Sequence, residues 1–161
     1  MKLIITGTPG TGKTTLAGML GKKLKAKVIN ELRLAKKKGI AEKTGKELEV
    51  DLKKLKSILL KEFKKHERLI IEGHLLCELK LPVDLVIVLK CNPKLLEERL
   101  RKQRNYSEEK IMDNVFCEET RYCLAKALKN YSRQKVIQLG NDNNLKNSLD
   151  NITRILMERN L

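Results

Sequence analysis

Apolar and polar residues along this chain form segments that predict strands and helices in turn. Short apolar runs, typical of strands, occupy residues 2–6, 26–30, 68–72, 84–89 and 135–139. Between and after them, apolar residues recur at helical spacing over residues 14–24, 50–65, 93–104, 107–131 and 145–159. The almost continuously apolar runs are typical of strands that helices cover on both faces of a parallel sheet. The pattern therefore predicts a three-layer α/β/α sandwich with five parallel strands.

The whole chain, residues 1–161, is expected to form one domain. Its length lies within the range of single hydrophobic cores, and no repeat or low-complexity linker divides it. Segment 32–45 is polar and loosely patterned, with Gly39 and Gly45 as expected breaks. Ser107 is predicted to cap the start of a helix.

A glycine-rich turn follows the first predicted strand and matches the phosphate-loop pattern G-x-x-x-x-G-K-[ST] from Gly7 to Thr14. Glycine permits backbone torsions that turn successive N–H groups toward phosphate oxygens. Lys13 is predicted to contact the β- and γ-phosphates, and the hydroxyl of Thr14 to bind Mg²⁺. Because a strand precedes the loop and a helix follows it, the sequence predicts a site for ATP and Mg²⁺.

Phosphoryl transfer also needs a carboxylate that positions the Mg²⁺ shell, usually at the end of a buried strand. Glu72 ends the apolar run 68–72, and Gly73 allows a tight turn after it. Glu72 is therefore predicted to hold Mg²⁺, directly or through water. His74 is predicted to lie near the phosphates, where a neutral imidazole can position a water or accept a proton. A loop histidine with a structural hydrogen bond is the alternative.

A basic cluster precedes the turn at residues 105–107 and contains Arg99, Arg101, Lys102 and Arg104. Positive charge on a mobile lid can stabilise the charge that develops during transfer. Arg104, at the junction of helix and turn, is predicted to contact phosphate. A solvated basic helix end is the alternative for at least some of these four residues.

Charge narrows the range of partners but leaves two interpretations. The chain has 35 Lys and Arg against 20 Asp and Glu, a formal net charge of +15. Such a field attracts polyanions such as nucleotides and RNA. A lysine-rich solvated surface, as in heat-adapted proteins, explains the composition equally well.

Two function classes are not expected. No apolar run approaches the ~20 residues of a membrane span, and no signal peptide opens the chain. We therefore expect no membrane association and a cytoplasmic protein, or a nuclear one if the source is eukaryotic. The four cysteines lack the paired spacing of zinc sites, so buried thiols are expected.

Together these motifs resemble those of the adenylate kinase isoenzyme six family, and most closely its archaeal branch. The resemblance rests on the loop TPGTGKTTL at residues 8–16, on Glu72-Gly73-His74, on the run 84–89 with Cys91 and Pro93 after it, and on RNYSEEKIMDNVFCE at 104–118. Segment 104–118 is the specific part, because a phosphate loop alone fits many families.

The resemblance implies a nucleoside-monophosphate-kinase core with strand order 2-3-1-4-5 and a short lid. The monophosphate-binding segment would run over about residues 30–53 and the lid over about 103–113. The catalytic residues would be Lys13, Glu72, His74 and Arg104, although many relatives carry Asp in place of Glu72. Carried over by position, the ATP-binding residues would be Gly7, Gly10, Thr11, Gly12, Lys13, Thr14, Thr15 and Arg104. The loop at 140–144 would flank the adenine.

The resemblance also implies two activities and a cellular role. Members transfer the γ-phosphoryl group of ATP to AMP and hydrolyse ATP, and they are linked to maturation of the small ribosomal subunit. Partners would be a ribosomal protein of the subunit platform and pre-ribosomal RNA. Hydrolysis is also expected physically, because a short lid excludes water poorly. Two alternatives remain: an ATPase assembly factor with negligible kinase activity, and a kinase for another small acceptor.

Overall fold

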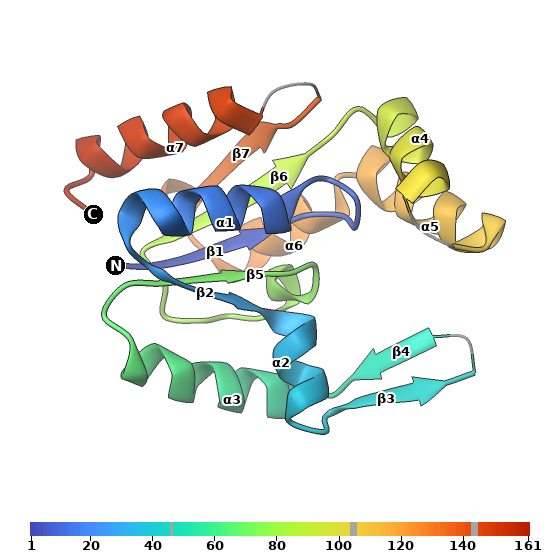
Figure 1. The fold of residues 1–161 in the computed structure, drawn as a ribbon, viewed down its shortest axis with the longest axis horizontal. Coiled ribbons are helices and arrows are strands. Elements are labelled where there is room, and N and C mark those ends of the chain that lie inside the picture. Colours follow the sequence, from blue (N-terminus) through green and yellow to red (C-terminus); the bar gives the residue numbers. More distant parts are fainter. Residues whose placement is uncertain (46, 104–105, 143–144) are drawn as a thin grey trace.

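Five parallel strands form the centre of the fold in a computed structural model that describes residues 1–45, 47–103, 106–142 and 145–161. The sheet has the spatial order β2-β5-β1-β6-β7 and lies between layers of helices (Figure 1). Its strands are β1 (Lys2–Thr6), β2 (Lys27–Asn30), β5 (Leu69–Glu72), β6 (Leu85–Lys90) and β7 (Val136–Gly140).

Seven α-helices accompany the sheet in the described part of the chain. They are α1 (Lys13–Leu24), α2 (Glu31–Lys37), α3 (Leu52–Lys65), α4 (Pro93–Gln103), α5 (Glu108–Glu119), α6 (Tyr122–Asn130) and α7 (Leu145–Glu158). Short 3₁₀ turns occur at Leu75–Glu78 and Arg133–Lys135. The predicted three-layer α/β/α class is confirmed.

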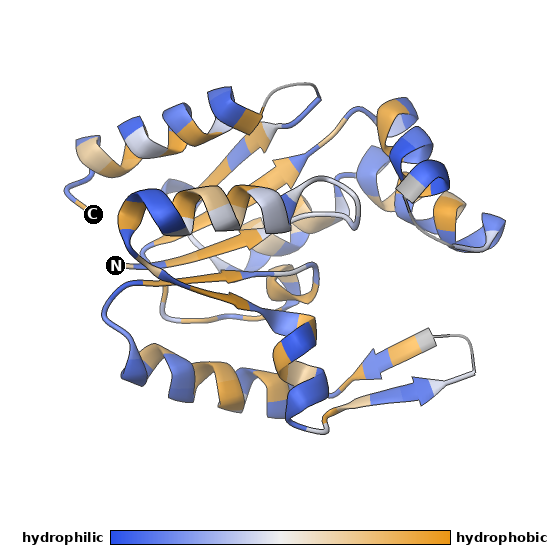
Figure 2. Cartoon of the chain, in the orientation of Figure 1, coloured by the Kyte–Doolittle hydropathy of each residue, from blue (hydrophilic) through white to orange (hydrophobic). Residues whose placement is uncertain are grey.

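Each face of the sheet has its own aliphatic core. Leu3 and Ile5 of β1 pack with apolar residues of α1 and α7 on one face. Ile4 of the same strand packs with residues of α3 and α6 on the other. Successive side chains of a strand point to opposite faces, so β1 contributes to both cores. Apolar residues accordingly concentrate along the strands, and polar residues along the outer sides of the helices (Figure 2).

The strand order agrees with the expected 2-3-1-4-5 once the sheet's strands are counted along the chain by themselves. The labels differ because an antiparallel hairpin, β3 (Ala41–Thr44) with β4 (Glu47–Val50), intervenes. The hairpin and the helix α2 occupy a segment for which the sequence predicted little regular structure. The residues of this segment are largely charged and exposed. They therefore lack the periodic spacing of apolar residues by which a sequence indicates a helix or a strand.

Helix boundaries differ from the predicted ones where a local group decides them. The third helix begins at Leu52 because the side chain of Asp51 accepts hydrogen bonds from the backbone N–H groups of Lys53 and Lys54. The single helix predicted over 107–131 is wrong: Arg121, in the left-handed region at φ 53°, separates α5 from α6. Ser107 caps α5 as predicted, accepting from the N–H of Lys110 at 3.4 Å.

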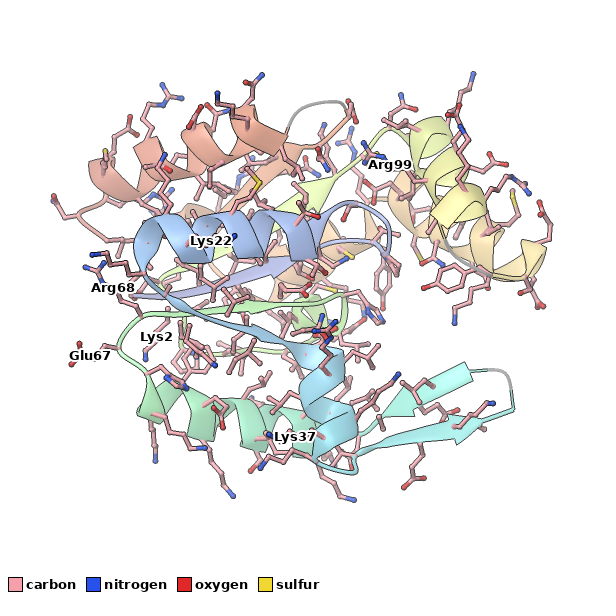
Figure 3. All side chains as sticks on the ribbon, viewed as in Figure 1. Lys2, Lys22, Lys37, Glu67, Arg68 and Arg99 are labelled. Atoms are coloured by element: carbon pink, nitrogen blue, oxygen red, sulfur yellow. The ribbon has the colours of Figure 1, made fainter. Side chains whose placement is uncertain are left out.

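The surface and the cysteines largely match the expectations from composition. Basic side chains such as Lys22 and Lys37 extend into solvent from different helices (Figure 3). Cys77, Cys91 and Cys123 are buried thiols, as expected, whereas Cys117 is only half-buried. Among the described residues, no helix combines the length and apolar character that a membrane span requires.

Tyr131→Phe is expected to lower the free energy of unfolding by about 1–3 kcal/mol, because it removes a buried hydroxyl with two partners. This hydroxyl accepts from the N–H of Leu81 at 3.0 Å and donates to the carbonyl of Leu79 at 2.8 Å. Urea unfolding followed by circular dichroism measures the loss. Tyr122→Phe, which removes an exposed hydroxyl that donates to Glu78, is the control and should cost less. Equal losses would contradict the prediction.

Candidate functional site

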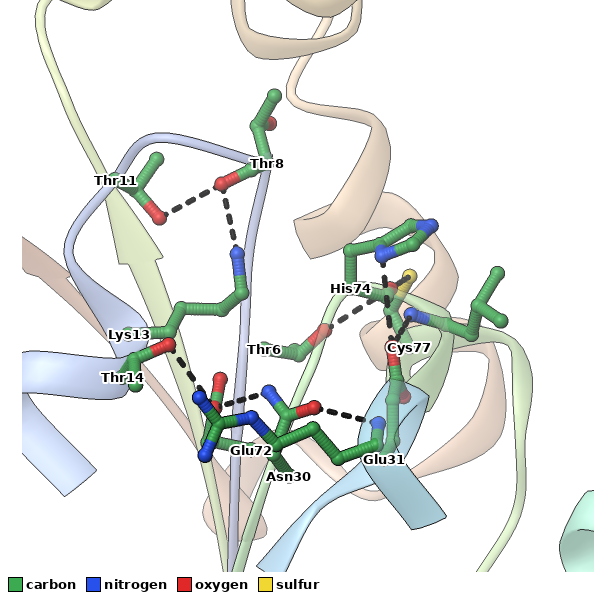
Figure 4. A network of polar contacts seen from close by, with 12 residues as sticks. Thr6, Thr8, Thr11, Lys13, Thr14, Asn30, Glu31, Glu72, His74 and Cys77 are labelled. Atoms are coloured by element: carbon green, nitrogen blue, oxygen red, sulfur yellow. Dashed lines mark hydrogen bonds and ion pairs between the residues drawn. The ribbon is translucent and has the colours of Figure 1, made fainter. Parts of the chain in front are cut away.

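The carboxyl ends of three strands bring the predicted site residues together. Parallel pairing sets Ile5 of β1 beside Glu72 of β5, and Asn30 of β2 beside Glu72. The phosphate loop follows β1, so it emerges next to the end of β5. In open α/β sheets, ligands bind in the crevice outside the carboxyl ends of the strands. Figure 4 shows the polar network that forms at this edge.

The phosphate loop requires glycine at positions where the backbone is both left-handed and crowded. Gly7 has φ 142°, and a Cβ there would lie 2.2 Å from the carbonyl oxygen of Leu89. Gly12 has φ 95°, and its Cβ would lie 2.5 Å from Nδ2 of Asn141. Gly12 is also the residue from which α1 begins, so the positive end of that helix faces the loop.

Lys13 lies inside the loop and is mostly buried. Its ammonium donates to the carbonyl oxygen of Thr8 at 2.8 Å, and the hydroxyl of Thr11 donates to the same oxygen at 2.9 Å. The cation is thus held where the loop closes on itself, the position at which a phosphate-loop lysine meets the outer phosphates of a nucleotide.

Thr14 and Glu72, predicted to bind Mg²⁺, contact each other. The hydroxyl of Thr14 donates to Oε1 of Glu72 at 3.0 Å, and the side-chain amide of Asn30 donates to the same oxygen. Mg²⁺ prefers oxygen ligands and is usually held by one or two protein groups together with phosphates and waters. This pair of oxygens fits that requirement. The described residues contain no group of three or more His, Cys, Asp or Glu that could hold a metal ion alone.

Glu31 is a buried carboxyl in the site that the sequence analysis did not single out. Its side chain is 1% exposed; Oε1 accepts from the N–H of Leu75 at 2.8 Å. Oε2 has no hydrogen-bond partner among the described residues. Burial raises the pKa of this carboxyl to about 8. The sequence offered one sign of this residue, an acidic side chain directly after the predicted strand at 26–30.

Gly73 and His74 both pack closely against the side chain of Glu31. A Cβ on Gly73 would lie 2.0 Å from the carboxyl carbon of Glu31, so only glycine fits there. Nδ1 of His74 lies 3.5 Å from Oε1 of Glu31, and the imidazole is 45% exposed. His74 thus lines the same cavity as Lys13 and Glu72, with the carboxyl of Glu31 beside it, and its contact with phosphate stays a prediction.

A cavity of about 370 Å³ joins these residues to more distant parts of the chain. The phosphate loop, the end of β5 and the start of α2 border it on the inner side. The outer side is formed by the hairpin, through Leu48 and Val50, and by α5 with the residue before its cap, through Tyr106, Lys110 and Asp113. The segments expected to bind a monophosphate and to form the lid thus face one cavity.

The residues of the basic cluster at 99–104 differ in their contacts. Arg104, the predicted phosphate contact, lies outside the described residues. Arg101 donates to Glu97 at 3.0 Å and to Glu108, which ties α4 to α5. Arg99 donates to the backbone carbonyl oxygens of Asn141, at 3.0 Å, and of Asp142, at 2.6 Å. Structural partners therefore occupy both residues. Arg101 is exposed, as the alternative of a solvated helix end requires, whereas Arg99 is half-buried.

Two side chains that the sequence analysis missed hold the phosphate loop from outside. Glu118 of α5 accepts from the hydroxyl of Thr8 and from the N–H of Cys91 at 2.8 Å. Asn141, in the loop expected to flank the adenine, donates to the carbonyl oxygen of Thr11 at 2.8 Å. Both are far from the loop in sequence, so no local signal pointed to them.

Comparison with known sequences decides the family. An AAA-domain family model matches residues 3–121. A Pyrococcus furiosus protein named "putative adenylate kinase" is 46% identical over 128 residues, which are 80% of this chain and 69% of that protein. The chain belongs to the family of archaeal proteins that carry this name. A Methanocaldococcus jannaschii member with the same name is 31% identical over 163 residues, 99% of this chain and 88% of its own length. This family member is thus a phosphotransferase enzyme.

Solved structures support the same fold at lower identity. Shikimate kinase from Bacteroides thetaiotaomicron has a TM-score of 0.67 and 20% identity, with 98% of each chain covered. A gluconokinase from Sinorhizobium meliloti has a TM-score of 0.65 and 11% identity, with 98% of this chain and 94% of the other covered. These likenesses establish a P-loop kinase fold for this family member.

Glu31→Gln is expected to stabilise the protein by about 4 kcal/mol at pH 8 and by less than about 1 kcal/mol at pH 5. Unfolded Glu31 loses its proton near pH 4.5, whereas the buried carboxyl retains it until about pH 8. Between these values the folded state holds the extra proton, so stability falls as pH rises. Urea unfolding at both pH values measures the difference.

Glu62→Gln is the matched control for that series. Glu62 is a half-buried carboxyl, 13% exposed, that lies 3.5 Å from His66, as Glu31 lies 3.5 Å from His74. A hydrogen bond from Lys65 lowers the pKa of Glu62, so its removal should slightly destabilise the protein at pH 8. A gain of stability for both variants would contradict burial as the cause.

Proposed function

We propose that this protein is an adenylate kinase that transfers the γ-phosphoryl group of ATP to AMP with Mg²⁺. One observation carries the proposal: Lys13, Thr14 and Glu72 line one cavity, and the hydroxyl of Thr14 donates to Glu72 where the phosphate loop lies beside the end of β5. The relatives' name, adenylate kinase, supports AMP as the acceptor.

In this proposal each part of the loop has one task. Backbone N–H groups of residues 7–15 bind the phosphates, and Lys13 exchanges the carbonyl of Thr8 for the β- and γ-phosphate oxygens. Thr14 and Glu72 hold Mg²⁺, directly or through water. When bound, the metal neutralises charge on the β- and γ-phosphates. Arg104 is proposed to add positive charge from the lid.

The acceptor is proposed to enter the cavity between residues 30–53 and the lid at residues 103–113. Asn30, Glu31 and the hairpin lie on one side of this cavity, and Tyr106 with Lys110 on the other. An ionised phosphate oxygen of AMP is itself the nucleophile, so orientation beside the γ-phosphate is the main requirement. His74, half exposed at the same place, is proposed to contact the transferring group.

We further propose that the enzyme hydrolyses ATP slowly and acts in maturation of the small ribosomal subunit. Exposed lysines on α2 and α3, among them Lys36, Lys37, Lys53 and Lys64, support contact with pre-ribosomal RNA. The acidic residues 108–109 and 118–119 are proposed to face a basic platform ribosomal protein. Glu109 and Glu119 would make the contact, because Arg101 pairs with Glu108, and Thr8 and Cys91 occupy Glu118. Binding of one such ribosomal protein, with an affinity that depends on the bound nucleotide, would support this role. An affinity that is the same with and without nucleotide would refute gating by ATP.

ADP and phosphate should be followed together, with ATP–Mg²⁺ alone and then with each nucleoside monophosphate. We expect rapid ADP formation with AMP, with no matching rise in phosphate, because AMP then replaces water as the acceptor. Slow phosphate release that AMP barely changes would refute the kinase proposal and favour an ATPase switch. Rapid transfer to another monophosphate but not to AMP would identify a different acceptor.

Lys13→Ala is expected to lower AMP phosphorylation by about 10²–10³-fold, because the cation stabilises charge that develops on the transferred group. The fold should survive, since the loop lies at the edge of the sheet and the cores contain no part of this side chain. Circular dichroism checks the fold. Lys22→Ala, an exposed lysine of the same helix, is the control and should retain activity. Unfolding of the Lys13 variant would contradict the assignment.

A further inference from the structure

Glu31 places a carboxyl oxygen without a hydrogen-bond partner beside the phosphate loop. Its side chain is 1% exposed, and Oε2 is a buried side-chain oxygen for which the described residues offer no donor. A buried polar atom without a partner costs free energy, so it calls for an explanation. The surrounding structure is shaped to keep this carboxyl, since Gly73 leaves the space that it fills.

The described groups around Glu31 satisfy one carboxyl oxygen and leave the other without a donor. Oε1 accepts from the N–H of Leu75 and lies 3.5 Å from Nδ1 of His74. Oε2 has no such contact. Glu31 lines the same cavity as Lys13, Thr14 and Glu72, where the γ-phosphate of ATP is proposed to lie.

The two proposed acceptors differ in whether they carry a proton. A phosphate oxygen of AMP is ionised and needs no base in order to attack. Water is neutral, and general bases contribute about 10²–10⁴-fold to reactions in which such a proton must leave. Transfer to AMP thus gives a buried proton acceptor no task, whereas hydrolysis does. Oε2 is covered in this structure, so this task requires a small local displacement that admits a water molecule beside it.

We propose that Glu31 is the general base for ATP hydrolysis in this site. The oxygen of a water molecule forms a bond to the γ-phosphorus, and the bond from that phosphorus to the bridging oxygen of ADP breaks. ADP leaves with the electron pair of that bond, and the proton of the water passes to Oε2 of Glu31. The inference rests on the proposed binding of ATP at this loop and extends it to the second activity.

The burial of Glu31 suits this task. Desolvation raises the pKa of the carboxyl to about 8, so its ionised form is a stronger base than a surface carboxylate. Lys13 opposes this rise by electrostatic attraction, and Glu72 adds to it. A base with a pKa near the working pH combines a usable ionised fraction with a driving force for proton transfer.

The test compares phosphate release from ATP alone with ADP formation from AMP, in Glu31→Gln and in the wild type at pH 8. We expect phosphate release to fall about 10²-fold, and at least about tenfold more than AMP phosphorylation does. Nucleotide affinity, measured with a fluorescent ATP analogue, separates lost binding from lost chemistry. Glu62→Gln is the control, because it removes a carboxyl at the same distance from the other histidine and should change neither activity.

Glu31→Ala provides an independent readout that a structural role would not give. Formate is a carboxylate small enough to enter the space left by the truncated side chain. Added formate should restore phosphate release at least about fivefold in this variant and in no variant that keeps Glu31.

Three results would overturn the inference. They are equal losses of both activities in Glu31→Gln, unchanged phosphate release in that variant, and no phosphate release from the wild type. Failure of the kinase proposal would appear differently, as a wild type that forms no ADP from AMP. The ratio of phosphate release between wild type and Glu31→Gln remains measurable in that case.

Discussion

Parallel pairing of β1 with its two neighbours is the constraint on which the rest of this structure depends. Ile4 and Ile5 are fully buried, and β5 and β6 bind the strand along both edges, so its register has no freedom to shift. That register sets where the phosphate loop leaves the sheet. It also sets Glu72 level with the loop, which allows the hydroxyl of Thr14 to reach the carboxylate. A slip of one residue would exchange the two faces of the strand and separate the site residues.

The phosphate loop is held by distant parts of the chain as well as by its own glycines. Glu118 joins α5 to Thr8, and Asn141 joins the loop after β7 to Thr11. Movement of α5 or of the loop after β7 is therefore linked physically to the shape of the phosphate-binding backbone. Such links are the means by which closure around one substrate can affect the geometry that the other meets.

Glu31 shows how stability and chemistry oppose each other in this site. A carboxyl that burial keeps protonated up to about pH 8 weakens the folded state at neutral and higher pH. The same burial makes its ionised form a better proton acceptor than a carboxylate in water. The space that Glu31 fills also requires glycine at position 73, because any side chain there would collide with the carboxyl group. Active sites commonly contain groups of this kind, whose surroundings favour function over stability.

The sequence by itself determined the fold class, the five strands and the phosphate loop, because each leaves a local pattern. Buried strands need continuous apolar residues, and the loop needs Gly7, Gly12 and Lys13 at fixed spacing. Glu72 and Ser107 were also predictable, since a strand end and a helix cap depend on near neighbours. Only the tertiary structure decided the contacts of Glu31, Glu118 and Asn141, because their partners lie far away along the chain. It also revealed the hairpin, whose charged residues hold no periodic signal, and the break at Arg121, where a left-handed backbone ends a helical pattern.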